Sequence, residues 1–170
     1  MERPAGRGAL RAPPQSRTYA RPVSGPAARV LLDTNVISEP TRPRPSPAVL
    51  AYLASLPADA SYLSLITLGE IETGIVLAKD PRRAIKLRRW LDDQIKPVYA
   101  GRILALDDTV IQRWGEFMAL PAVRARQSVA VDALIAATAS VHQLSVATRN
   151  LADFTVFPID SYDPWTYVTA

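Results

Sequence analysis

The chain contains no cysteine and one histidine, His142. Without cysteine it can form no disulfide, no thiol nucleophile and no zinc–sulfur site, which fits a reducing cytoplasm. With one histidine it cannot use a histidine pair for acid–base catalysis or build a multi-histidine metal site. Any catalysis by this chain must therefore depend mainly on carboxylates, hydroxyl groups, lysine or arginine.

Long hydrophobic runs are also missing. No apolar stretch approaches the roughly 20 residues that a membrane-spanning helix requires. The longest stretch, residues 129–141, is interrupted by Asp132. Of the 170 residues, 48% are hydrophobic and 21% are charged, as in an ordinary globular domain. We expect a cytoplasmic protein without a membrane segment.

The excess positive charge is concentrated at the amino terminus. Residues 1–28 hold five arginines, one glutamate and five of the 15 prolines, whereas residues 29–170 hold 15 basic and 15 acidic groups. A segment as rich in proline and arginine as residues 1–28 buries too little apolar surface to offset the conformational entropy lost on ordering. We predict a disordered Pro/Arg-rich extension over residues 1–28, which a mis-assigned start codon would also explain, and one folded domain over residues 29–170. The charge of the chain is thus weak evidence that the folded domain binds nucleic acid.

Short apolar runs alternate with amphipathic segments along the folded part. The runs at residues 30–32, 62–66, 102–106, 144–147 and 155–159 are predicted strands, and the segments at residues 47–56, 67–79, 81–95, 108–120 and 128–142 are predicted helices. The helix at 81–95 would place Arg82, Lys86, Arg89 and Lys96 on a solvated outer face. This alternation predicts a three-layer α/β/α sandwich around a mostly parallel sheet.

Four carboxylates occupy corresponding places in this pattern. Asp33 directly follows the first strand, and Asp153 follows the strand at 144–147. Glu70 and Asp132 stand near the starts of two helices. Strand carboxyl ends and the helix starts that follow them share one edge of a parallel sheet, so we expect all four acids at that edge.

Each acid also has a simpler interpretation. Glu70 completes a capping-box pattern with Thr67, Asp132 could favour the helix dipole, and Asp153 could be a turn residue. Asp132 is the hardest to explain this way, because an unpaired charge among its apolar neighbours would cost several kcal/mol.

Taken together, the four acids indicate a metal site. Two like charges ~4 Å apart repel by about 4 kcal/mol at an effective dielectric constant of 20, so a cluster of four requires a counter-ion. Oxygen ligands without histidine or cysteine favour Mg²⁺ or Mn²⁺. Such an ion can activate water and hold a phosphodiester, which is phosphoryl-transfer chemistry.

At this point the motifs resemble those of PIN-domain endoribonucleases of the VapC type, most closely the FitB branch. The resemblance depends on Leu31-Leu32-Asp33-Thr34-Asn35-Val36-Ile37-Ser38-Glu39, Leu65-Ile66-Thr67-Leu68-Gly69-Glu70-Ile71, Asp132-Ala133-Leu134-Ile135-Ala136-Ala137, Val146-Ala147-Thr148-Arg149-Asn150 with Asp153-Phe154, and Asp163-Pro164-Trp165. It spans about residues 29–168 and implies a PIN-like fold.

The resemblance also implies roles. Asp33, Glu70 and Asp132 would be the catalytic metal-site acids and Asp153 the fourth, acting through water. Thr34, Asn35 and Thr148 would orient the carboxylates, with Arg149 and Asn150 as further supporting or substrate-contacting residues. The implied partners are an RNA substrate, a second copy in a homodimer, and a DNA-binding antitoxin that blocks the site in a heterotetramer or larger assembly.

Two alternative functions stay open. A catalytically silent RNA-binding PIN module would keep the fold without the chemistry. An aspartyl phosphatase-like hydrolase would use Asp33 as a phosphoryl acceptor, but such enzymes need a second aspartate where Asn35 stands and a downstream lysine, and residues 97–170 contain no lysine.

A partner-binding groove is predicted between the helices at 67–79 and 81–95. Ile71, Ile75, Val76 and Leu77 spread apolar surface over more than one side of the first helix, and Trp90 adds to it on the second.

Overall fold

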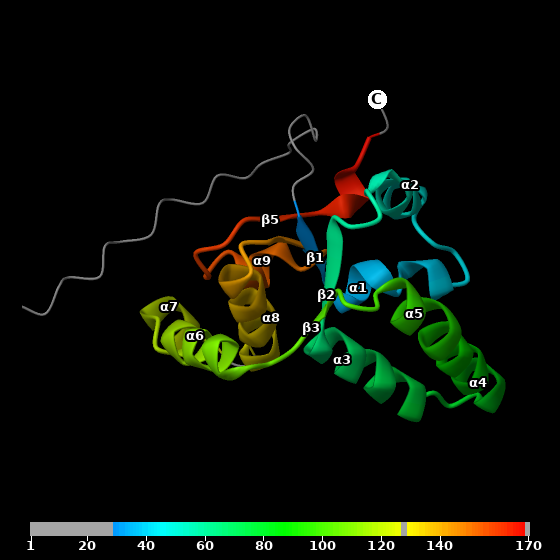
Figure 1. The fold of residues 1–170 in the computed structure, drawn as a ribbon, viewed down its shortest axis with the longest axis horizontal. Coiled ribbons are helices and arrows are strands. Elements are labelled where there is room, and N and C mark those ends of the chain that lie inside the picture. Colours follow the sequence, from blue (N-terminus) through cyan, green and yellow to red (C-terminus); the bar gives the residue numbers. More distant parts are fainter. Residues whose placement is uncertain (1–28, 127–128, 169–170) are drawn as a thin grey trace, which may run out of the picture.

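Five parallel strands form the centre of the computed structural model, which describes residues 29–126 and 129–168 (Figure 1). The strand order is β3-β2-β1-β4-β5, with bounds β1 Val30–Leu32, β2 Ser61–Ser64, β3 Ile103–Leu104, β4 Ser145–Ala147 and β5 Ser161–Tyr162. Helices cover both faces, so the predicted three-layer α/β/α sandwich is confirmed. The predicted extension over residues 1–28 lies outside the described residues.

The central strand β1 is buried on both faces. Val30 and Leu32 point into one hydrophobic core and Leu31 into the other, and none of the three is exposed. This explains why the run is apolar at every position instead of alternating. β1 pairs with β2 on one side and with β4 on the other. The order in which strands are added to the sheet therefore reverses at β1, which makes it the topological switch point of the sheet. Ligands of parallel sheets bind outside the strand carboxyl ends at such a point.

The helices from the first half of the chain cover one face of the sheet (Figure 1). They are α1 Thr34–Ile37, α2 Pro47–Ser55, α3 Leu65–Val76 and α4 Pro81–Trp90, which continues through a π-helical turn at Leu91–Ile95 into α5 Lys96–Val98. The opposite face carries α6 Asp108–Met118, α7 Pro121–Arg124, α8 Ala130–Val141 and α9 Leu151–Phe154.

Several predicted element boundaries differ from the structure: the strand predicted at residues 62–66, for example, ends at Ser64. Two of the differences have a clear physical cause. The helix predicted to start at Thr67 starts at Leu65, because the hydroxyl of Ser64 accepts a hydrogen bond from the Ile66 amide (3.2 Å) and caps it first. The last strand is β5, not residues 155–159. That segment turns instead, because Phe157 packs against Phe117 and Phe154, with ring centroids 5.4 and 6.3 Å apart.

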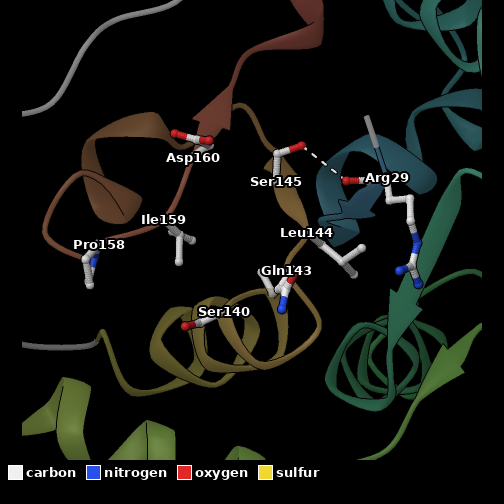
Figure 2. A pocket seen from close by; sticks show the side chains of 9 residues that line it. Arg29, Ser140, Gln143, Leu144, Ser145, Pro158, Ile159 and Asp160 are labelled. Atoms are coloured by element: carbon white, nitrogen blue, oxygen red, sulfur yellow. Dashed lines mark hydrogen bonds between the residues drawn. The ribbon is translucent and has the colours of Figure 1, made fainter. Parts of the chain in front are cut away.

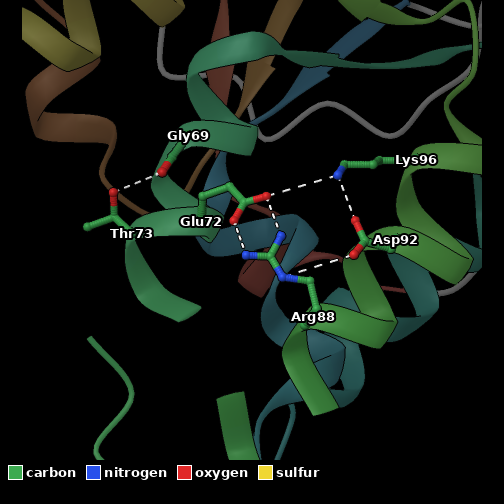
Figure 3. A network of polar contacts seen from close by, with 6 residues as sticks. All are labelled: Gly69, Glu72, Thr73, Arg88, Asp92 and Lys96. Atoms are coloured by element: carbon green, nitrogen blue, oxygen red, sulfur yellow. Dashed lines mark hydrogen bonds and ion pairs between the residues drawn. The ribbon is translucent and has the colours of Figure 1, made fainter. Parts of the chain in front are cut away.

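An ion network joins α3 to α4 (Figure 3). The carboxylate of Glu72 on α3 accepts hydrogen bonds from both guanidinium NH₂ groups of Arg88 on α4. The Nζ atom of Lys96 lies 2.6 Å from a carboxylate oxygen of Asp92 and 4.0 Å from one of Glu72. Lys96, predicted on a purely solvated face, therefore takes part in holding the two helices together. Exposed pairs of this kind each stabilise a protein by about 0–1 kcal/mol, so the network mainly sets how the helices lie.

Only some of the apolar residues predicted to line a groove between these helices are exposed. Ile71 and Ile75 belong to the core and are 6% and 7% exposed, whereas Val76 and Leu77 are 78% and 72% exposed. Ile85 on α4 is also exposed. We call Val76, Leu77 and Ile85 the α3–α4 apolar surface.

Among the described residues, no helix is both long enough and apolar enough to cross a membrane.

Candidate active site at the carboxyl edge of the sheet

The end of β1 places Asp33 at the switch point between β1 and β4. The residue caps α1 and is 5% exposed. Its carboxylate accepts three hydrogen bonds, from the Thr34 amide (2.7 Å), the Asn35 side-chain amide (2.6 Å) and the Thr148 hydroxyl (2.6 Å). Burial raises the pKa of Asp33, and these three hydrogen bonds oppose that rise. The carboxylate is therefore fixed in orientation.

Thr34 connects Asp33 to Glu70. The backbone amide of Thr34 donates a hydrogen bond to Asp33, and its hydroxyl donates a hydrogen bond to Oε2 of Glu70. Burial raises the pKa of Glu70, the Thr34 hydrogen bond opposes this, and the charge of Asp33 adds to the rise. Glu70 lies in the second turn of α3, since Ser64 caps that helix. The capping-box interpretation of Thr67 and Glu70 is therefore wrong.

Asp132 stands in the first turn of α8 and is partly buried. Burial, as the largest cause, and the charges of Asp153, Asp33 and Glu70 together raise the pKa of Asp132 to about 6. Within the described parts of the chain, no hydrogen bond or ion pair compensates the Asp132 carboxylate. The negative charges of the other three acids thus disfavour the charged form of Asp132. Among the described residues, no cationic side chain pairs with Asp132 to offset this repulsion.

Asp153, on α9, differs from the other three acids. Its carboxylate lies 3.8 Å from Nη1 of Arg126, which also donates a 2.7 Å hydrogen bond to the carbonyl of Ala152. No local sequence pattern points to Arg126 as a partner of Asp153, because the two residues are 27 positions apart. An acid already paired with arginine is less available as a direct metal ligand than Asp33 or Asp132.

The remaining predicted residues form one hydrogen-bond network around Asp33. The Thr148 hydroxyl, fully buried, accepts from the Asn150 amide (3.0 Å). The side-chain carbonyl of Asn35 accepts from the Arg149 amide (3.2 Å), and its NH₂ group lies 3.3 Å from the Thr148 hydroxyl. The turn after β4 is thereby tied to the start of α1. The Asn150 side chain makes no capping hydrogen bond to α9.

The donor chemistry of this edge suits a hard divalent cation. In residues 29–126 and 129–168, no three acidic or histidine side chains group closely enough to hold a metal ion. A magnesium ion nevertheless keeps several of its waters and binds through one or two carboxylates. The oxygen-only donors and the uncompensated charge at Asp132 therefore fit Mg²⁺ or Mn²⁺.

A cavity elsewhere in the molecule does not involve these acids (Figure 2). Arg29, Ser145 and Asp160 line it, and they stand at or just before the starts of β1, β4 and β5. The cavity therefore lies at the amino edge of the sheet, opposite Asp33.

The chain is similar to known proteins of the PIN domain family. The PIN domain family profile matches residues 30–156. The chain is 39% identical to Toxin FitB of Neisseria gonorrhoeae over 136 residues, covering 80% of this chain and 98% of that protein. It is 33% identical to VapC ribonuclease Y4jK of Sinorhizobium fredii over 136 residues, covering 80% and 97%. The solved structure of FitAB bound to an IR36 DNA fragment superposes with a TM-score of 0.75 at 36% identity, covering 82% of this chain and 98% of that one.

Proposed function

This chain belongs to the PIN domain family, and from that premise we propose that it is a metal-dependent endoribonuclease and the toxin of a type II toxin–antitoxin pair. The reaction would be hydrolysis of an RNA phosphodiester bond by water. The observation that carries the proposal is the placement of Asp33, Glu70, Asp132 and Asp153 at the carboxyl edge of the sheet. The charges of the other three acids all raise the pKa of Asp132, and the charge of Asp33 also raises the pKa of Glu70.

Asp33 and Asp132 would hold a Mg²⁺ or Mn²⁺ ion, with Glu70 beside them. When bound, the cation would supply positive charge for the phosphodiester and lower the pKa of the attacking water. Thr148 and Asn35 keep the Asp33 carboxylate oriented through their hydrogen bonds. Asp153 is paired with Arg126, so in this proposal it acts through water.

The proposal includes partners. The similar solved structure of FitAB bound to an IR36 DNA fragment supports a two-component system, in which a small antitoxin would carry the DNA-binding function and block the acids of this chain. We also propose a homodimer, which would give a heterotetramer or larger assembly with the antitoxin. We also propose that the protein acts in the cytoplasm.

A cleavage assay tests the proposed activity. Protein freed of antitoxin should cut a structured RNA in Mg²⁺ or Mn²⁺ and leave it intact in EDTA. Asp33→Asn should abolish cleavage, because the amide loses the charge that the cation requires. Asp160→Asn is the matched control: it removes one exposed carboxylate at the opposite edge of the sheet and should cut like wild type.

The same assay separates the alternatives. Cleavage that persists in EDTA or in Asp33→Asn would contradict the proposal. RNA binding without cleavage under all metal conditions would indicate the silent RNA-binding module. Hydrolysis of p-nitrophenyl phosphate with a phosphorylated Asp33 would indicate the phosphatase-like reaction.

A further inference from the structure

The segment Asp163-Pro164-Trp165 has no role in the site described above. It forms a single 3₁₀ turn, Pro164–Thr166, in which Oδ1 of Asp163 accepts a 2.8 Å hydrogen bond from the Trp165 amide. Pro164 is buried, and Trp165 packs against the core that contains Val30 and Leu32. The indole is therefore held in place from several sides.

Arg149 lies over the ring of this indole. The guanidinium carbon of Arg149 lies 5.2 Å from the centre of the Trp165 ring, within the range of a cation–π interaction. The Arg149 amide donates to Asn35, which in turn donates to Asp33. The backbone of Arg149 is thus anchored to the hydrogen-bond network around Asp33, and its side chain is anchored to the indole of Trp165.

The charge of Arg149 is free for a ligand. The residue is exposed, and throughout the described parts of the chain no carboxylate lies within ion-pair distance of its guanidinium. Arg126, by contrast, is engaged by Asp153. A polyanion that approaches four carboxylates is repelled, and the balanced charge of residues 29–170 offers no general attraction to compensate.

We propose that Arg149 binds a phosphate of the RNA strand next to the bond that is cut, and that Trp165 is the positioning residue that holds it there. The inference rests on the proposed function. A guanidinium matches a phosphate with two parallel hydrogen bonds. Stacking on the indole restricts the long side chain beforehand, so that less conformational entropy is lost when the RNA binds.

The chain offers a matched control for the loss of this arginine. Arg29 also stacks on an aromatic ring, with its guanidinium carbon 4.6 Å from the centre of the Tyr62 ring, but it precedes β1 at the opposite edge of the sheet. Arg29→Ala and Arg149→Ala therefore remove the same charge and the same kind of contact. Only the second change lies beside the acids.

Two measurements test the inference on the full chain. Affinity for a fluorescein-labelled single-stranded RNA is followed by anisotropy in EDTA over a range of salt concentrations, where no cleavage is expected. Steady-state cleavage in Mg²⁺ then separates KM from kcat. Melting temperatures establish that each variant is folded.

Arg149→Ala should weaken RNA binding about tenfold, raise KM by a similar factor with a smaller effect on kcat, and reduce the salt dependence by roughly one phosphate contact. Trp165→Leu should weaken binding by about two- to fivefold, and Trp165→Phe should recover part of that loss because it restores an aromatic face. Arg29→Ala should bind and cut like wild type.

The inference is overturned if Arg149→Ala binds RNA like wild type, or if Arg29→Ala weakens binding as much, which would show a general effect of charge. It is also overturned if Trp165→Leu and Trp165→Phe bind RNA equally. Wild-type protein that neither binds nor cuts RNA would overturn the proposed function itself, and this outcome is distinct from a wild type that cuts normally while Arg149 proves irrelevant.

Discussion

The hydroxyl of Thr148 donates a 2.6 Å hydrogen bond to the carboxylate of Asp33, and both residues are buried. The bond joins the ends of β4 and β1, which are neighbours in the sheet but come from distant parts of the sequence. Of the three hydrogen bonds to Asp33, it does most to oppose the rise in the pKa of Asp33 on burial. The position of β4 therefore controls both the orientation and the charge of the first acid.

Thr148→Val should damage the site through this bond. Valine has nearly the same shape but no donor, so the pKa of Asp33 should rise further. Loss of a buried hydrogen bond to a carboxylate destabilises a protein by about 1–3 kcal/mol. Loss of a group that orients a metal-site ligand typically lowers activity or metal affinity about 10- to 100-fold. Cleavage rates and melting curves measure the two effects, and Thr148→Ser should restore most of both.

Thr138→Val provides the control for that experiment. Thr138 is fully buried in α8, and its hydroxyl donates to the carbonyl of Leu134 at 2.8 Å. This variant also loses a buried hydroxyl but leaves Asp33 untouched. A fall in cleavage equal to that of Thr148→Val would mean that general stability, and not the Asp33 contact, determines the activity.

Residues 1–28 should be dispensable for folding and cleavage. Their composition predicts no buried surface, and the PIN domain match begins at residue 30. A variant lacking them should keep its cleavage rate, with a melting temperature within about 1–2 °C of the full chain, as for changes that cost under ~0.5 kcal/mol. A fall of several degrees would show that this segment stabilises the domain.

The α3–α4 apolar surface should bind the antitoxin. A Val76→Ser, Leu77→Ser double variant should fold normally, because both side chains are largely exposed, but should bind antitoxin at least about tenfold more weakly through loss of apolar contact area. Calorimetric titration measures this. Ile111→Ser, at an exposed apolar position on α6, should leave the affinity unchanged. Equal affinities of the double variant and wild type would contradict the assignment.

Sequence reasoning succeeded where one physical effect dominated. The uninterrupted apolar run at Val30, Leu31 and Leu32 can only be satisfied by burial on both faces, so the central strand and Asp33 at its end were predicted correctly. It failed where two local signals competed. Ser64 and Thr67 can both cap a helix, and only the end of β2 decides in favour of Ser64.

Contacts between distant residues were beyond sequence reasoning. The apolar run at 155–159 looks like a strand, but Phe157 packs against Phe117 of the distant α6 as well as against the nearby Phe154. The pairing of Arg126 with Asp153 depends on how the segment that follows α7 approaches α9. The motifs therefore located Asp153 at the site but could not show that a neighbouring arginine shares its charge.

Asp132 should make the metal-free protein less stable. Its carboxylate is partly buried near three other acids, and its pKa is raised to about 6. A folded-state pKa above the ordinary value of 3.8 means that the folded protein binds the proton more tightly than the unfolded chain does. In EDTA the destabilisation should be complete above about pH 6 and should fade as the pH falls through 6 toward 3.8.

Asp132→Asn should therefore melt higher than wild type in EDTA at pH 7, by roughly 1–2 kcal/mol or a few degrees after allowing for solvent screening of the half-exposed group. The advantage should shrink near pH 4–5, where wild-type Asp132 is protonated. Saturating Mg²⁺ should reduce or reverse it, because a bound ion stabilises only the protein that binds it. If Asp132 merely serves the helix dipole, the variant should instead melt lower in EDTA, by ~0.3–1 kcal/mol. Melting curves of both proteins at two pH values, with and without metal, decide between the two signs.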